Sequence, residues 1–308
     1  MSDMKKLPAF ALFASGLLAG IIIIMVIGFR DPGKTDPAPA VQADAGGRWS
    51  APPLPAQIDF AGEKVPMEKW DIREQLDREV LYNYYWQNNI LYLMKLAGRY
   101  FPMIEAKLKA AGVPDDFKYL CIAESNMTNA TSRVGAVGFW QFMKGTAPGY
   151  DIEVSETVDE RYHAEKSTEA AAAYLKQAYA KFGSWTAAAA SYNCGMGGYS
   201  SHSSFQGTTD YYALQLPEET QRYIFRILAF KYILSNAGQL GFALHTDSAY
   251  KPVATRTVKV NQSITNLSAW ARENGSSYKE LKWHNPWLRA RTLTARKGKT
   301  YEIVLPAD

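Results

Sequence analysis

The sequence of 308 residues has little cysteine and histidine, with 2 of the first and 4 of the second. Two cysteines cannot form a multi-bridge scaffold, and no Cys/His spacing resembles a zinc site. We therefore expect no metal and no other cofactor. The net charge of +4 is spread along the chain and forms no dense basic stripe, so a nucleic-acid partner is not expected either.

The composition is that of a folded chain, with 47% hydrophobic and 21% charged residues. This length suits one medium domain and a smaller one, each with its own core. Aromatic residues make up 13% of the sequence, including 8 Trp and 19 Tyr. Most of these rings are expected in the core, while exposed rings commonly stack on sugar faces or anchor protein interfaces.

The N-terminal region contains an uncharged stretch at residues 7–29, which is long enough to cross a bilayer. Two lysines precede it, so residues 1–6 are expected in the cytoplasm and the rest of the chain outside. A cleaved signal peptide is the alternative, but the small-residue sites around Ala38 and Ala43 lie well beyond the apolar run. Residues 30–66 are expected to form a flexible linker, because Asp31–Gln57 is rich in Pro, Ala, Gly and Asp.

Residues 67–248 have helical periodicity and few strand patterns, which predicts a mainly helical domain. One apolar stripe contains Ile72, Leu76 and Val80. Further helices are expected at residues 167–182, 185–194 and 218–237. The glycine-bearing stretches 135–149 and 195–209 are expected to be loops that border a cleft.

Residues 249–308 have a different pattern, which predicts a small separate module. Residues 255–260 and 300–305 alternate as strands do, and two short helical stretches at 266–274 and 277–283 lie between them. The expected order is β-α-α-β.

Glu124 is the residue in the helical domain that most needs an explanation. It lies seven positions after Phe117 and four after Leu120, so it points from the same apolar face of the helix. Burial would favour its neutral form and raise its pKa, as a general acid near neutral pH requires. The alternative is a glutamate at a helix end whose head reaches water.

Four motifs follow one another along the helical domain. They are Glu124-Ser125, the run from Ser132 to Met143 with Thr146-Ala147, the run from Ala190 to Gly195, and the run from Pro217 to Tyr223. In order and approximate spacing, they resemble the lysozyme-like catalytic domain of the lytic transglycosylases. The run Asp159-Glu160-Arg161 makes the similarity greatest to the membrane-bound lytic murein transglycosylase D type, although His163 stands where an Asp is expected.

The resemblance implies a role for each matched residue. Glu124 would act as acid and then as base, with the N-acetyl group of the sugar in place of a second carboxylate. Tyr192 and Asn193 would orient Glu124 and hold the N-acetyl group. The remaining matched positions, which would lie near the substrate, are Ser125, Ser132, Gln141, Glu219 and Tyr223. Core packing for Tyr192, capping or turn roles for the two serines, and a structural hydrogen bond for Glu219 stay open as alternatives.

The C-terminal module resembles a lysin motif, a fold that binds N-acetylated glycans. Leu281–Leu288 matches the second helix and Asn-Pro turn of that motif, whereas the start and end of the module depart from it. Trp270, Trp283 and Trp287 would contact glycan, or they would be core or docking residues.

The function that the resemblance implies is cleavage of the bond between N-acetylmuramic acid and N-acetylglucosamine in peptidoglycan, with 1,6-anhydro ends. The expected partners are peptidoglycan strands and, through residues 7–29, the cytoplasmic membrane, with the catalytic part on the periplasmic side. A hydrolytic muramidase of the goose-lysozyme kind and a non-catalytic wall-binding scaffold are the alternatives.

Overall fold

The structure is a computed structural model that describes residues 50–307. The expected anchor at 7–29 and the cytoplasmic residues 1–6 lie outside the described residues. Among residues 50–307, no helix combines the length and the apolar content that a membrane span needs.

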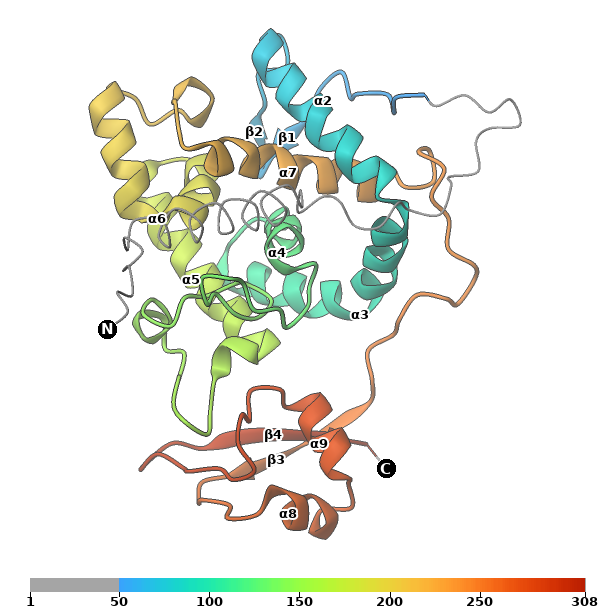
Figure 1. The fold of residues 1–308 in the computed structure, drawn as a ribbon, viewed down its shortest axis with the longest axis vertical. Coiled ribbons are helices and arrows are strands. Elements are labelled where there is room, and N and C mark those ends of the chain that lie inside the picture. The colour runs from blue at the N-terminus through green and yellow to red at the C-terminus, as the bar shows by residue number, and fades with distance from the viewer. Residues whose placement is uncertain (1–49, 308) are drawn as a thin grey trace, which may run out of the picture. The chain divides into compact units, whose positions relative to one another are not determined.

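The expected helical domain is present. It contains α2 (Trp70–Tyr85), α3 (Gln87–Ala111), α4 (Phe117–Ser125), α5 (Ala164–Phe182), α6 (Trp185–Gln206) and α7 (Glu218–Ser235). Helix α7 packs on α2, α4 and α6, and α5 packs on both α3 and α6. The short α4 is therefore enclosed by longer helices, with α7 on one side and α3 on another (Figure 1).

The expectation of a flexible linker through residue 66 is wrong at its C-terminal end. Strands β1 (Asp59–Phe60) and β2 (Glu63–Lys64) form a small antiparallel hairpin there. Phe60 and Val65 are buried in the helical core, and the Phe60 ring meets the edge of Phe117 at a centroid distance of 5.2 Å. Apolar burial of this kind holds the segment on the domain, so the folded part begins before residue 67.

The expected loop at 195–209 is also wrong over most of its length. Helix α6 continues to Gln206, with a single kink at Gly195, where φ is 77° and ψ is 149°. Glycine adopts this conformation without a Cβ penalty, so the chain can bend there and resume the helix. The expected loop at 135–149 is confirmed in its main part, with a short 3-10 helix only at Ala147–Tyr150.

The C-terminal module has the expected β-α-α-β order. Strands β3 (Thr255–Val260) and β4 (Tyr301–Pro306) pair antiparallel along their whole length. Between them lie α8 (Leu267–Glu273), capped by Asn266, and α9 (Tyr278–His284), which begins with a capping box. Both caps satisfy backbone N–H groups that a helix of two turns would otherwise leave unpaired.

Candidate active site

Glu124 lies in the last turn of α4, and the helix stripe expected from the sequence is confirmed. Phe117 and Leu120 are fully buried, while Glu124 keeps part of its surface accessible. The helix ends directly after Ser125, because Asn126 and Met127 both have positive φ angles, of 53° and 56°. This sharp exit leaves the Glu124 carboxyl near the end of the helix.

The environment of Glu124 favours its neutral form. Burial raises its pKa from 4.5 to about 7, and the nearby charge of Glu219 acts in the same direction. A hydrogen bond from the Tyr223 hydroxyl to Oε1 and the charge of Arg226 oppose this increase without cancelling it. A carboxyl with a pKa near 7 can both give and take a proton at neutral pH.

Helix α7 supplies the groups that act on Glu124. Glu219, Tyr223 and Arg226 are spaced by four and three residues, which places them on one helix face. Arg226 Nη1 lies 3.0 Å from Glu219 Oε1, and its Nε lies 3.9 Å from the buried Glu79. The guanidinium is thus paired with two other carboxylates and leaves Glu124 only partly compensated.

The sequence interpretation missed Arg226 and Glu79. The spacing of Arg226 from Tyr223 could have identified it as a residue of the same face. Nothing local could have identified Glu79, which lies on α2 and binds Arg222 Nε at 2.7 Å.

Two of the expected site residues hold the loop of residues 132–142, here called the substrate loop. Ser125 Oγ donates to the carbonyl of Phe139 at 2.8 Å, and the Tyr192 hydroxyl donates to that of Trp140 at 2.8 Å. Burial and the charge of Glu124 raise the pKa of Tyr192 well above 10. The hydroxyl that reaches Glu124 is that of Tyr223, whereas Tyr192 bonds to the loop beside it.

Ser132 and Gln141 stabilise the substrate loop from within. Ser132 Oγ accepts from the Ala136 N–H at 3.0 Å. Gln141 has a φ of 49°, and its Nε2 donates to the carbonyls of Ala130 and Gly138 at 3.1 and 2.8 Å. Neither side chain has a hydrogen bond to Glu124, and the bonds that both make stabilise the loop.

Asn193 lies at the end of the first half of α6, just before the Gly195 kink. Its Oδ1 accepts from Thr220 Oγ1 at 2.8 Å, which ties α6 to the first turn of α7. The amide nitrogen is the donor that Asn193 can offer to a ligand.

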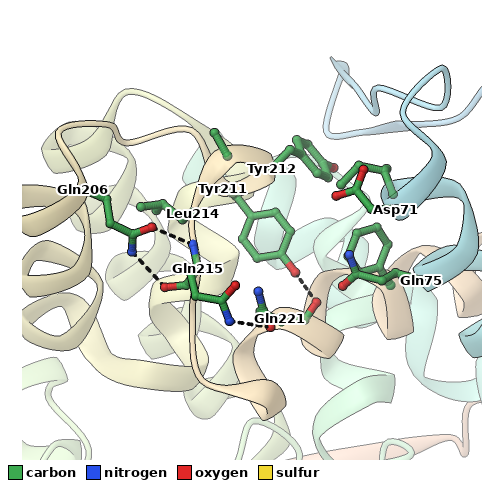
Figure 2. A pocket seen from close by; sticks show the side chains of 11 residues that line it. Asp71, Gln75, Gln206, Tyr211, Tyr212, Leu214, Gln215 and Gln221 are labelled. Atoms are coloured by element: carbon green, nitrogen blue, oxygen red, sulfur yellow. Dashed lines mark hydrogen bonds between the residues drawn. The ribbon is translucent and has the colours of Figure 1, made fainter.

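A separate pocket of about 220 Å³ is lined by residues of α2, the end of α6, residues 211–215 and α7 (Figure 2). Gln221 and Phe225 line it, and each is two residues from Tyr223, so they leave the helix on a different face. Gln206 and Gln215 are hydrogen-bonded to each other across its wall, as Figure 2 shows. This pocket does not contain Glu124. Within residues 50–307, no cluster of three or more His, Cys, Asp or Glu has the arrangement of a metal site.

Comparisons with known proteins find two family models that match parts of this chain. Residues 101–214 match the transglycosylase SLT domain, a range that contains Glu124, the substrate loop and Tyr192. Residues 256–308 match the soluble lytic transglycosylase C-terminal LysM-like domain, which confirms the expected relation of the module to lysin motifs. Helix α7 lies outside both matched ranges, so the contact of Tyr223 with Glu124 comes from the structure alone.

The chain is also similar to curated proteins of known name. It is 28% identical over 254 residues to "Membrane-bound lytic murein transglycosylase D" of Escherichia coli strain K12 and, to the same extent, of strain O6:H1. The aligned region is 80% of this chain and 54% of each relative, so the chain spans about half the length of the curated relatives it matches. The expected similarity to this type is confirmed.

Proposed function

We propose that the chain is a peptidoglycan lytic transglycosylase that cleaves the β-1,4 bond from N-acetylmuramic acid to N-acetylglucosamine. The observation that carries the proposal is the half-buried Glu124 of the SLT domain, whose pKa is raised to about 7. The names of the similar proteins support the same reaction and substrate class. Among residues 50–307, no second carboxylate is hydrogen-bonded to Glu124, and the nearby Glu219 is paired with Arg226.

In the first step, Glu124 gives its proton to the oxygen that links the two sugars. The bond from that oxygen to C1 of the muramic acid breaks, and the N-acetyl oxygen of the same sugar stabilises the positive charge at C1. The Glu124 carboxylate that results accepts the hydrogen bond from Tyr223. This bond becomes stronger when the carboxyl loses its proton, so it favours the charged product of the step.

In the second step, the 6-hydroxyl of the muramic acid attacks C1 and closes the 1,6-anhydro ring. Its proton passes to Glu124, which returns to its starting state. In this proposal, the amide of Asn193 holds the N-acetyl group, and the substrate loop, stabilised by Ser132 and Gln141, contacts the sugars. Ser125 and Tyr192 fix that loop beside Glu124 through their bonds to Phe139 and Trp140.

Product masses test the reaction. Purified sacculi are digested with wild type and with Glu124→Gln, and the soluble products are weighed. We expect wild type to release muropeptides lighter by one water than hydrolytic products, and the variant to release almost none. Products of hydrolytic mass would indicate a muramidase, and a wild-type protein that binds sacculi without releasing products would indicate a scaffold.

We also propose that residues 7–29 anchor the enzyme in the cytoplasmic membrane, with the SLT domain in the periplasm. The uncharged run and the two preceding lysines support this placement, as does the membrane-bound type of the relatives. In cell fractionation, the full chain should stay with the membrane after a high-salt wash. A chain that starts at residue 50 behind a cleavable signal should be released in the soluble periplasmic fraction.

A further inference from the structure

One segment of the helical domain, residues 153–163, is packed into the C-terminal module. Val158 is fully buried within the module's core and forms a β-bridge with Leu288. On either side of it, the Asp159 N–H donates to the carbonyl of Trp287 at 2.9 Å, and the Arg289 N–H donates to that of Thr157 at 2.8 Å. The segment, here called the docking segment, therefore fixes the module to the helical domain.

The docking segment carries two buried carboxylates whose countercharge comes partly from the module. The side chains of Glu153 and Glu160 are each 1% exposed, and Lys299 Nζ lies 2.9 and 2.8 Å from them. Tyr301 adds a hydroxyl bond to Glu153 at 3.0 Å, and Lys166 of α5 pairs with Glu160. Arg296 of the module also lies 3.3 Å from Glu153, but Lys299 is the module cation that contacts both carboxylates. Because a poorly compensated buried carboxylate is costly, removal of the Lys299 charge would disturb the segment.

The other end of the docking segment holds the substrate loop. Arg161 is fixed by Asp159 at 2.9 and 2.7 Å, and its Nη1 donates to the carbonyls of Gly135 and Phe142 at 3.2 and 3.1 Å. Gly138 lies so close that a Cβ there would be 1.9 Å from the Arg161 carbonyl oxygen. The loop is thus held by the docking segment on one side, and by Ser125 and Tyr192 on the other.

We propose that the C-terminal module positions the substrate loop, with Lys299 as the positioning residue that acts through Glu153, Glu160 and Arg161. The proposal rests on the function proposed above, and it gives the module a role in the reaction besides any binding of glycan. Loss of the Lys299 charge loosens the loop that contacts the sugars and leaves Glu124 and Tyr223 in place. The effect should therefore fall on KM more than on kcat.

The test compares Lys299→Met, Lys299→Arg and the control Lys259→Met in the otherwise intact full chain. Lys259 lies on the same module but is exposed, at 3.8 Å from an exposed Glu302. Kinetics of anhydro-product formation are measured on soluble glycan fragments, and hydrogen exchange is measured at the amides of residues 135–142. For Lys299→Met, we expect KM to rise about tenfold with kcat within about threefold, and faster exchange in the loop. Lys299→Arg and Lys259→Met should stay near wild type.

A second variant tests the proposal independently in case the Lys299→Met protein misfolds. Tyr301→Phe removes only the hydroxyl, which donates to Glu153 and accepts from the Arg296 N–H, and it keeps the ring that stacks on Trp287 at a centroid distance of 6.0 Å. This variant should also show a higher KM and faster hydrogen exchange in the substrate loop, with smaller changes than Lys299→Met. Unchanged KM and unchanged exchange at residues 135–142 in both variants would overturn the proposal. A wild type that forms no anhydro product would overturn the proposed function instead, and the exchange data would still decide whether the module holds the loop.

Discussion

Two regions of this protein contain buried glutamates whose pKa values are shifted in opposite directions. At the end of α4, burial raises the pKa of Glu124 to about 7, because Arg226 is engaged by Glu79 and Glu219. In the docking segment, burial would raise the pKa of Glu160 as well, but hydrogen bonds from Lys166 and Lys299 hold it below 4.5. The positions of the cations, rather than burial alone, decide the outcome.

The difference separates a chemical role from a structural one. A buried carboxyl without its own cation is poised to exchange a proton at neutral pH, at some cost in stability. A buried carboxylate between two lysines stays charged and ties together the elements that contribute them. Substitutions in either region should therefore have different effects on activity and on stability.

The largest effect is expected from Glu124→Gln, which removes the exchangeable proton and keeps the shape of the side chain. Formation of anhydro products should fall by about 10²- to 10⁴-fold. Product release from sacculi, followed by mass spectrometry, measures the loss. Glu74→Gln, at an exposed position of α2, is the matched control and should keep full activity. If the Glu124→Gln variant kept its activity, Glu124 would not be the residue that transfers the proton.

The next largest effect is expected where the docking segment meets the substrate loop. Gly135 and Gly138 both have a φ of 83°, but only Gly138 has a backbone oxygen in the way of a Cβ. Gly135→Ala should cost about 1 kcal/mol from backbone strain alone. Gly138→Ala should cost about 3 kcal/mol, because Arg161 must also move. Denaturant unfolding measures both, and equal costs would mean that the close contact does not matter.

The opposite pKa shifts of Glu124 and Glu160 can be tested by measuring the stability of variants as a function of pH. Since the pKa of Glu124 is raised in the folded state, its contribution to stability decreases as the pH rises from about 4.5 through 7. Glu124→Gln should therefore stabilise the protein by about 1–2 kcal/mol at pH 8 and by almost nothing at pH 4.

The lowered pKa of Glu160 has the opposite consequence. Its contribution is present above about pH 4.5 and is lost as the pH falls through its folded pKa. Glu160→Gln should destabilise the protein by about 1–3 kcal/mol at pH 8, and by less at pH 3. Urea unfolding followed by circular dichroism measures both variants, and shifts of the same sign at pH 8 would contradict the comparison.

The smallest effect is expected from Tyr223→Phe. The hydroxyl bond lowers the pKa of Glu124, so its loss should move that pKa above 7 and shift the alkaline limb of the activity profile to higher pH. Maximum activity should fall about tenfold. Tyr232→Phe is the control, because its hydroxyl bonds to the carbonyl of Pro53 away from the site. A profile unchanged from wild type would show that Tyr223 does not set the pKa.

The sequence predicted what depends on local periodicity. The stripe that carries Glu124 and the β-α-α-β order of the module follow from patterns within a few residues. The prediction of a loop at 195–209 was wrong because a glycine can either bend a helix or end it. The sequence pattern does not distinguish these two outcomes. The predicted linker extended too far because the burial of Phe60 depends on a contact with Phe117, which is distant in the sequence.

The contacts that define the site could not have been predicted in this way. Tyr223 is 99 residues from Glu124, and no spacing rule connects them. The same holds for Lys299, which is 139 residues from Glu160. Resemblance placed Tyr192 and Tyr223 near the site, but only the packing of α7 on α4 decides which hydroxyl reaches the carboxyl.

The pKa of Glu124 itself is the most direct test of the account. Carbon-13 NMR of protein labelled at the glutamate side-chain carboxyls can follow each group through a pH titration, with Glu124→Gln and Glu160→Gln for assignment. We predict one carboxyl that titrates at about pH 7 and is absent from Glu124→Gln. A second, absent from Glu160→Gln, should titrate below pH 4.5. If the Glu124 carboxyl titrated at or below pH 4.5, the central claim would be wrong.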